Sequence, residues 1–140
     1  IILGPGPGNP SSQTDKKISR LNDLLDDVLE KKIPFFAECL SHQVLCKKLG
    51  FSIIRKEKPF QGVQESIDLF GNFMRVGFYN TFSAIHDQTI PNINVAADPK
   101  TNEIHALQSN QFYSTQFHPE SILTPDGFNF IKKILIALVN

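Results

Sequence analysis

The sequence has no net charge, few cysteines and no long apolar run, and each shortage excludes a class of protein. Its 14 basic and 14 acidic side chains give a formal net charge of zero, so neither a nucleic-acid surface nor an anionic membrane surface is expected. The longest apolar stretch, residues 134–139, is far too short to span a bilayer. A small neutral or zwitterionic substrate therefore fits the composition better than a nucleic acid or a membrane.

Cysteines and targeting signals are equally sparse. The chain has 2 cysteines, Cys39 and Cys46, with no CxxC spacing and no cluster of histidine ligands. This pattern disfavours both a disulfide framework and a zinc site. No secretory or transit segment is visible. These observations predict a protein of the reducing cytoplasm.

The size and composition suit one folded domain over residues 1–140. Of the 140 residues, 41% are hydrophobic and 20% charged, which is enough for a buried core. No internal repeat or low-complexity linker divides the chain. Residues 1–3 resemble the end of a strand, and the first residue is not methionine. We therefore expect an N-terminally incomplete domain or a piece of a longer polypeptide.

Strand-like and helical patterns alternate in the first half of the chain. Apolar residues recur every three or four positions from Thr14, the expected N-cap, to Lys32. A second, shorter helical pattern follows Cys39 and stops at Gly50, which suits a helix C-cap. The expected order is a strand at 1–3, a Gly- and Pro-rich loop at 4–10, a helix at 14–32, a strand at 33–37 and a helix ending before Gly50.

The second half is richer in strands. Short apolar or alternating runs predict strands at 51–55, 63–69, 75–82 and 112–117. A turn at 98–102 predicts a hairpin between 94–97 and 104–107, and helical spacing from Phe128 to Leu138 predicts a closing amphipathic helix. Together the two halves predict an α/β sandwich with added hairpin strands.

The most informative residue is Cys39, which lies where an apolar strand breaks into a helix. Its neighbours two positions away, Ala37 and Ser41, are small, as a sharp nucleophile-bearing turn requires. The start of the following helix is expected to favour a thiolate, and the Leu40 backbone N–H is placed to stabilise an oxyanion. The alternative is a buried inert thiol, which is the usual state of a cysteine.

A base and an orienting carboxylate for this thiol lie far downstream. In an extended segment His118 and Glu120 project to the same side, with Pro119 stiffening the link. Glu120 can then hold one imidazole nitrogen while the other faces the sulfur. The alternative is a solvated turn at the end of a strand. Together with the turn at Cys39, the pattern favours a cysteine acyl-transfer enzyme.

The remaining histidines and the second cysteine are weaker candidates. His42 lies in the first turn of the helix after Cys39, so its side chain should diverge from the sulfur although it can line the site or contact a partner. His86 and His105 are expected to be solvated. Cys46 is expected to be a core thiol.

Three motifs in this order resemble the signatures of class I glutamine amidotransferases. They are the loop GPGNP at 6–10, CLSHQ at 39–43 and QFHPES at 116–121. The resemblance implies the three-layer, flavodoxin-like sandwich of that family, with a first strand upstream that this chain lacks. It also implies that glutamine is the substrate and that no metal or cofactor binds in this domain.

The resemblance assigns a role to each matching position. It implies that Cys39 attacks the glutamine amide, that His118 transfers the proton and that Glu120 orients His118. The implied oxyanion hole consists of the backbone N–H groups of Leu40 and Gly6. The implied substrate contacts are Gly6, Gly8, Gln43 and the backbone of Thr81 and Phe82.

Departures from the common pattern indicate a subfamily. Ser41 stands where the family usually has glycine, and YNTF at 79–82 replaces the usual YHSL. With the segments 60–64, 67–71 and 75–82, these features resemble the amidotransferase domains of the 2-amino-2-desoxyisochorismate synthases of phenazine biosynthesis. That resemblance implies a chorismate-binding synthase partner, fused upstream or separate, which binds Mg²⁺. It also implies that the full enzyme is a homodimer.

Several alternatives stay open at this point. Anthranilate and aminodeoxychorismate synthases share this type of amidotransferase domain. A γ-glutamyl cysteine hydrolase or peptidase could use the same three residues, because they do not themselves select glutamine. A non-catalytic interaction domain that retains the fold is the third possibility.

Overall fold

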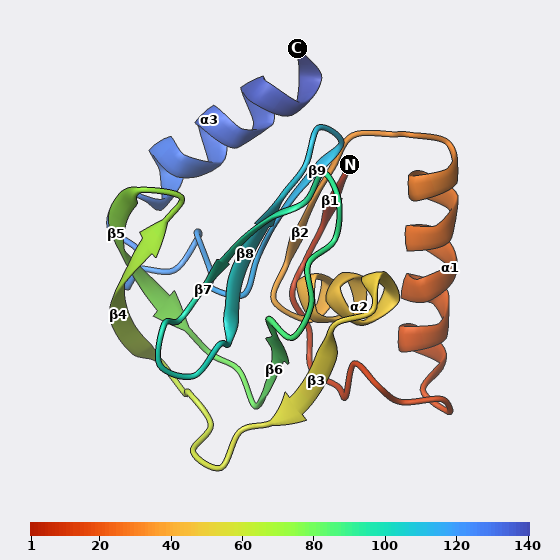
Figure 1. Ribbon diagram of the computed structural model, residues 1–140, viewed down its shortest axis with the longest axis horizontal. Helices are drawn as coiled ribbons and strands as arrows, with labels where there is room; N and C mark the ends of the chain where they lie inside the picture. The colour runs from red at the N-terminus through yellow and green to blue at the C-terminus, as the bar shows by residue number, and fades with distance from the viewer.

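A five-stranded sheet forms the middle layer of the computed structural model, which describes all 140 residues (Figure 1). The strand order is β1-β2-β9-β8-β7. The first three strands run parallel: β1 (Ile2–Leu3), β2 (Phe35–Glu38) and β9 (Phe112–Thr115). An antiparallel hairpin extends the sheet from β9 and consists of β7 (Asn94–Ala97) and β8 (Ile104–Gln108).

The sheet is apolar on both faces because successive residues of its central strands point in opposite directions. In β2, Phe35 packs into one hydrophobic core and Phe36 into the other. The neighbouring pair in β9, Phe112 and Tyr113, divides in the same way. Each face therefore requires its own covering layer.

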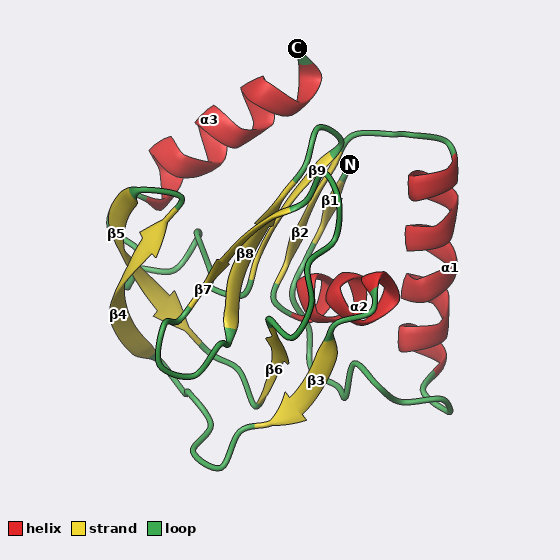
Figure 2. Ribbon diagram, viewed as in Figure 1, coloured by secondary structure: helices red, strands yellow, loops and turns green.

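Helices cover one face, and a hairpin with a helix covers the other (Figure 2). The first layer consists of α1 (Lys16–Glu30) and α2 (Leu40–Leu49). The opposite layer consists of the antiparallel pair β4 (Val63–Leu69) and β5 (Asn72–Phe78) with α3 (Gly127–Val139). A separate two-stranded sheet is formed by β3 (Ser52–Arg55) and β6 (Phe82–Ile85).

The predicted three-layer α/β architecture, its hairpin strands and its helices are confirmed. Gly50 ends α2 in the left-handed conformation with φ 105°, which glycine adopts without strain. The N-cap of α1 is Asp15 rather than Thr14, because the Asp15 carboxylate accepts a hydrogen bond from the Lys17 backbone N–H. None of the helices has the length and apolar character needed to cross a membrane.

The single strand predicted at 75–82 is wrong, since the chain turns between β5 and β6. The Asn80 side-chain amide donates to the Phe82 carbonyl at 2.8 Å, and this local bond competes with a continuous strand. Similarly, β9 ends at Thr115 rather than at residue 117, because the Thr115 hydroxyl donates to the Phe117 carbonyl at 2.9 Å. Both interruptions place residues of the predicted site in loops.

Candidate active site

The predicted nucleophile and base lie at the same edge of the sheet. Cys39 directly follows β2, and His118 comes shortly after β9. The two strands are parallel neighbours, so their carboxyl ends meet at one edge. The Cys39 backbone N–H donates to the Thr115 carbonyl at 2.8 Å and joins the two ends.

Cys39 occupies the sharp strand-to-helix turn that the sequence predicts. Its backbone has φ 52° and ψ −105°, a conformation that costs energy for any residue except glycine. The turn is fixed from outside by Ser41, whose hydroxyl donates to the Gly4 carbonyl at 2.7 Å. Strain of this kind, held by surrounding bonds, is typical of an elbow that presents a nucleophile.

The sulfur is held as a thiol rather than a thiolate. Burial is the main cause that raises the pKa of Cys39 to about 12, and Glu38 adds to the rise when it is ionised, although hydrogen bonds from the Leu40 N–H and the Gln116 amide lower it. The Gln116 amide lies 3.6 Å from the sulfur. The expectation that the helix start would favour the thiolate is therefore wrong, because burial outweighs it. The thiol requires a base to remove its proton.

His118 has one nitrogen engaged and the other free. Its Nδ1 lies 2.7 Å from Glu120 Oε1, which confirms that the two side chains project together. Its Nε2 is buried and has no hydrogen-bond partner. The His118 backbone is fixed by bonds to the Gly77 carbonyl at 2.9 Å and the Thr124 hydroxyl at 2.7 Å. Such an imidazole is prepared to accept a proton at Nε2.

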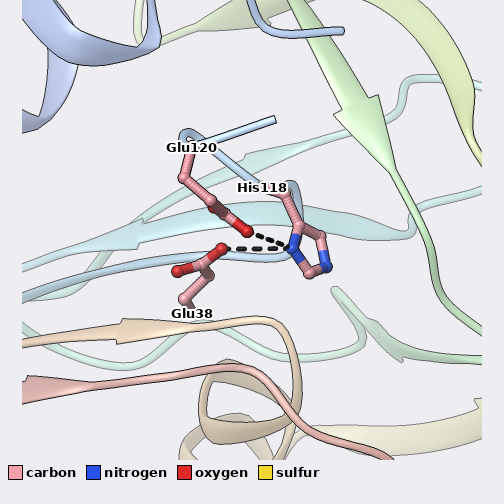
Figure 3. Close-up of side chains that lie close together, drawn as sticks. All are labelled: Glu38, His118 and Glu120. Carbon is pink, nitrogen blue, oxygen red and sulfur yellow. Dashed lines mark hydrogen bonds and ion pairs between the residues drawn. The ribbon is translucent and has the colours of Figure 1, made fainter. Parts of the chain in front are cut away.

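A second carboxyl group, which the sequence analysis missed, meets the same imidazole (Figure 3). Glu38 Oε1 lies 3.2 Å from His118 Nδ1, although its orientation does not form a hydrogen bond. Burial and the neighbouring Glu120 raise the pKa of Glu38 to about 9. Burial opposes ionisation of Glu120 as well, but hydrogen bonds with Glu38 and His118 lower its pKa. The missed signal was a charged residue at the end of an apolar strand.

The same three side chains are also close enough to be considered as metal ligands. Their ligand atoms lie within 4.8 Å of one another. Nδ1 is already committed to its hydrogen bond with Glu120, so we assign no metal to this cluster.

The predicted substrate residues line one open cleft with Cys39. The cleft has a volume of about 460 Å³, within the range of small-molecule sites. Gly8 has φ 137°, so the loop requires glycine at this position. A side chain at Gly6 would touch Leu40 at 3.6 Å, so the loop lies against the elbow there. The predicted residues in the lining are Gly6, Gly8, Gln43, Thr81 and Phe82, and the residues that were not predicted are Pro7, Asn9, Arg55, Tyr79 and Asn80.

Gln43 is fixed by the protein itself. Its amide nitrogen donates to the Phe82 carbonyl at 2.9 Å and to Gln116 Oε1 at 3.0 Å. The Phe82 carbonyl also accepts from Asn80 at 2.8 Å, and the Thr81 carbonyl accepts from the Lys56 N–H at 2.8 Å. Only the oxygen of Gln43 is therefore left for a ligand.

The other histidines and the second cysteine lie outside the cleft. His42 is fully buried and contacts Ser114 Oγ at 2.7 Å, and burial lowers its pKa to about 3. His86 is exposed and Cys46 lies in the core, as predicted. His105 is half-buried rather than solvated as predicted, because its ring centroid lies 5.4 Å from that of Phe78, and burial lowers its pKa.

Comparisons with known proteins agree with the three motifs. The model of the family "Glutamine amidotransferase class-I" matches residues 1–138. A phenazine-specific anthranilate synthase of Pseudomonas chlororaphis is 47% identical over 96% of this chain but only 22% of its own length. The anthranilate synthase component 2 of Saccharolobus solfataricus is 32% identical over 96% of this chain and 74% of its own.

Solved structures show the same fold. A glutamine amidotransferase of Thermotoga maritima superposes with a TM-score of 0.66 at 18% identity, covering 98% of this chain and 68% of that one. In sequence, this chain spans about a fifth of the length of the phenazine-specific relatives. From the family match over almost every residue, the chain belongs to the class I glutamine amidotransferases.

Proposed function

We propose that this domain hydrolyses the side-chain amide of glutamine with Cys39 as nucleophile, His118 as base and Glu120 as the group that orients the base. One observation carries the proposal. His118 holds Nδ1 against a carboxylate and keeps a buried, unpartnered Nε2, at the same sheet edge as a thiol on a strained elbow. Membership of the amidotransferase family supports glutamine as the substrate.

The reaction proceeds in two acyl-transfer steps. Cys39 Sγ bonds to the amide carbon while its proton passes to His118 Nε2. The carbon–nitrogen bond then breaks, and the imidazolium gives this proton to the nitrogen, which leaves as ammonia. Water then attacks the thioester carbon while one of its protons passes to His118 Nε2. The carbon–sulfur bond breaks, glutamate leaves, and the imidazolium returns the proton to the sulfur. The high pKa of Cys39 makes proton removal by His118 necessary for the first step.

The backbone around the sulfur provides the oxyanion site. The Leu40 N–H begins α2 beside the sulfur, and Gly6 lies against Leu40 on the facing loop. Donors fixed in this way stabilise the negative oxygen of the tetrahedral intermediate without reorganisation. Gly8 leaves room for the substrate at the same loop.

The amino-acid end of glutamine binds at the other end of the cleft. The Gln43 oxygen accepts from the substrate ammonium, because its nitrogen is engaged by the protein. The backbone N–H groups of Thr81 and Phe82 bind the carboxylate, since both carbonyls already accept protein hydrogen bonds. Arg55 pairs with Phe82 across β3 and β6 and is the one charged side chain in the lining. We assign the carboxylate to Arg55 as well.

The choice between an amidotransferase and a γ-glutamyl hydrolase is tested by substrate competition. A γ-glutamyl peptide has the same amino-acid end as glutamine, so the two substrates differ only at the leaving nitrogen. We expect the complete polypeptide to release glutamate from free glutamine and to ignore γ-glutamyl peptides. Glutamate release from each substrate is measured with an enzyme-coupled assay. Turnover of the peptides with free glutamine left intact would instead identify a hydrolase.

Replacement of Arg55 by alanine is expected to raise the KM for glutamine by roughly tenfold and to leave kcat nearly unchanged, since a charged hydrogen bond to substrate is lost. Arg55→Lys should show a smaller rise. Steady-state kinetics with glutamine, and with an analogue whose carboxylate is replaced by an amide, measure the effect. Equal KM changes for the two substrates would contradict the assignment.

We further propose that the ammonia is delivered to a chorismate-aminating synthase, as in phenazine biosynthesis. Support comes from 47% identity to phenazine-specific anthranilate synthases, of which this chain matches only 22% of the length. In this proposal the partner synthase binds chorismate and Mg²⁺ and is either fused to this domain or separate. The full enzyme is a homodimer and works in the cytoplasm. Anthranilate or aminodeoxychorismate synthesis is the second candidate, because relatives of both names match this chain.

A further inference from the structure

We propose that Glu38 is a second positioning residue for His118, and that it shares one proton with Glu120 so that the two carboxyl groups present a single negative charge to Nδ1. This inference rests on the proposed function. It adds to the three residues of the reaction a fourth that does not touch the substrate. It also gives the site an upper pH limit.

The geometry brings the three groups together from separate segments (Figure 3). Glu38 is the last residue of β2, and its partner in the parallel register is Thr115 at the end of β9. His118 and Glu120 follow β9. Nδ1 lies 2.7 Å from Glu120 Oε1 and 3.2 Å from Glu38 Oε1. This convergence depends on the pairing of two strands that are far apart in the sequence.

The surroundings of Glu38 do not favour a second charge. Its side chain is only 9% exposed, whereas that of Glu120 is 58% exposed. The ion-pair partner of Glu38 is the His118 imidazole, and no lysine or arginine pairs with it. Two carboxylates at such close range share a proton rather than both ionise. The proton therefore resides on the buried Glu38, and Glu120 stays ionised.

The protons can be assigned atom by atom. Nδ1–H donates to Glu120 Oε1, and the Glu38 hydroxyl donates to the Glu120 carboxylate. Nε2 then keeps its lone pair for the Cys39 proton. Burial raises the pKa of Glu38 to about 9, which agrees with a neutral Glu38 at neutral pH. A neutral Glu38 also spares the sulfur a negative charge that would hold its proton more tightly.

Loss of the Glu38 proton is expected to impair the site. The titratable groups facing Glu38 are the Cys39 thiol, the His118 imidazole and the Glu120 carboxylate, with the Tyr79 phenol ring 5.0 Å from the His118 ring. A second negative charge would repel Glu120 from its position on Nδ1 and raise the pKa of the thiol. We therefore expect kcat/KM for glutamine to fall as the pH rises above about 9.

The test is Glu38→Gln in the complete polypeptide, assayed for glutamine hydrolysis across the pH range. Glutamine keeps the shape and an N–H donor toward Glu120 but has no proton to lose. We expect an alkaline decline in kcat/KM that is absent or shifted upward by about one pH unit or more. Glu38→Leu, which lacks the donor, should lower kcat by roughly tenfold with little change in KM.

Thermal melts provide a readout that does not depend on activity. Folded Glu38 retains its proton up to about pH 9, whereas the same group in the unfolded chain loses it near its ordinary pKa of 4.5. The original protein therefore loses stability as the pH rises through this window. Glu38→Gln should not show that loss, so its advantage in Tm should grow from about pH 5 to about pH 9.

The outcomes separate this inference from the proposed function. An identical alkaline decline in the original protein and in Glu38→Gln would overturn the positioning role. A constant Tm difference across the window would overturn the buried proton. Absence of glutamine hydrolysis by the original protein would instead contradict the proposed function, and the melts would still test the proton on Glu38.

Discussion

Replacement of Cys39 by alanine is expected to abolish glutamine hydrolysis, with kcat falling by roughly 10⁴-fold or more. No second thiol can take its place, because Cys46 is fully buried in the core. With the proposed synthase partner present, amination of chorismate with ammonium as the nitrogen source should persist, since ammonia then enters without the amidotransferase step. Glutamate release and chorismate amination, with glutamine and with ammonium, are measured on the complete polypeptide.

Cys39→Ser is the matched control for this variant. It conserves the shape of the side chain on the strained elbow but replaces the thiol with a much weaker nucleophile. We expect it to bind glutamine and to hydrolyse it almost as poorly as the alanine variant. Glutamine-dependent amination that survives in Cys39→Ala would contradict the assigned nucleophile.

Replacement of Gly127 by alanine is expected to destabilise the protein by at least about 2 kcal/mol and to lower glutamine hydrolysis with it. A Cβ at Gly127, the first residue of α3, would lie 1.7 Å from the Pro119 carbonyl oxygen. Pro119 joins His118 to Glu120, so any relief of this clash displaces the base and its orienting carboxylate. Denaturant unfolding and steady-state kinetics measure the two effects.

Gly4→Ala is the matched control, because a Cβ at Gly4 would have no atom within 4 Å. We expect its unfolding free energy to stay within about 0.5 kcal/mol of the original value. Equal stability and activity of the two alanine variants would show that the start of α3 does not support the His118 segment.

The parts of the site that could be predicted are those written in short stretches of sequence. The elbow is visible because small residues flank Cys39 between an apolar strand and a helical pattern. His118 and Glu120 are visible because alternate residues of an extended segment share a face. The glycine loop is visible because it is rich in Gly and Pro, and Gly8 adopts a positive φ that other residues avoid.

The parts that were missed depend on contacts between distant segments. Glu38 meets His118 only because β2 and β9 pair in parallel with Glu38 beside Thr115. Arg55 reaches the cleft because β3 and β6 pair with Arg55 opposite Phe82. Neither pairing is readable from the local pattern of apolar residues, although the single charge in the apolar β2 strand was a usable signal.

The expected thiolate was wrong, and His105 is less solvated than expected, for a related reason. A helix start lowers the pKa of a nearby thiol through a local field, but burial depends on the whole fold and raises the pKa of Cys39 to about 12. Alternation within the β8 strand places His105 on one face, but only the packing of Phe78 decides that this face is covered.

The most direct test of the account is to trap the acyl intermediate. The complete polypeptide is mixed with glutamine, quenched in acid within a single turnover, and digested for mass spectrometry. The account predicts a glutamyl thioester on the peptide that contains Cys39, removable by hydroxylamine and absent in Cys39→Ala. Glutamine turnover without an adduct on Cys39, or with an adduct on another residue, would contradict it.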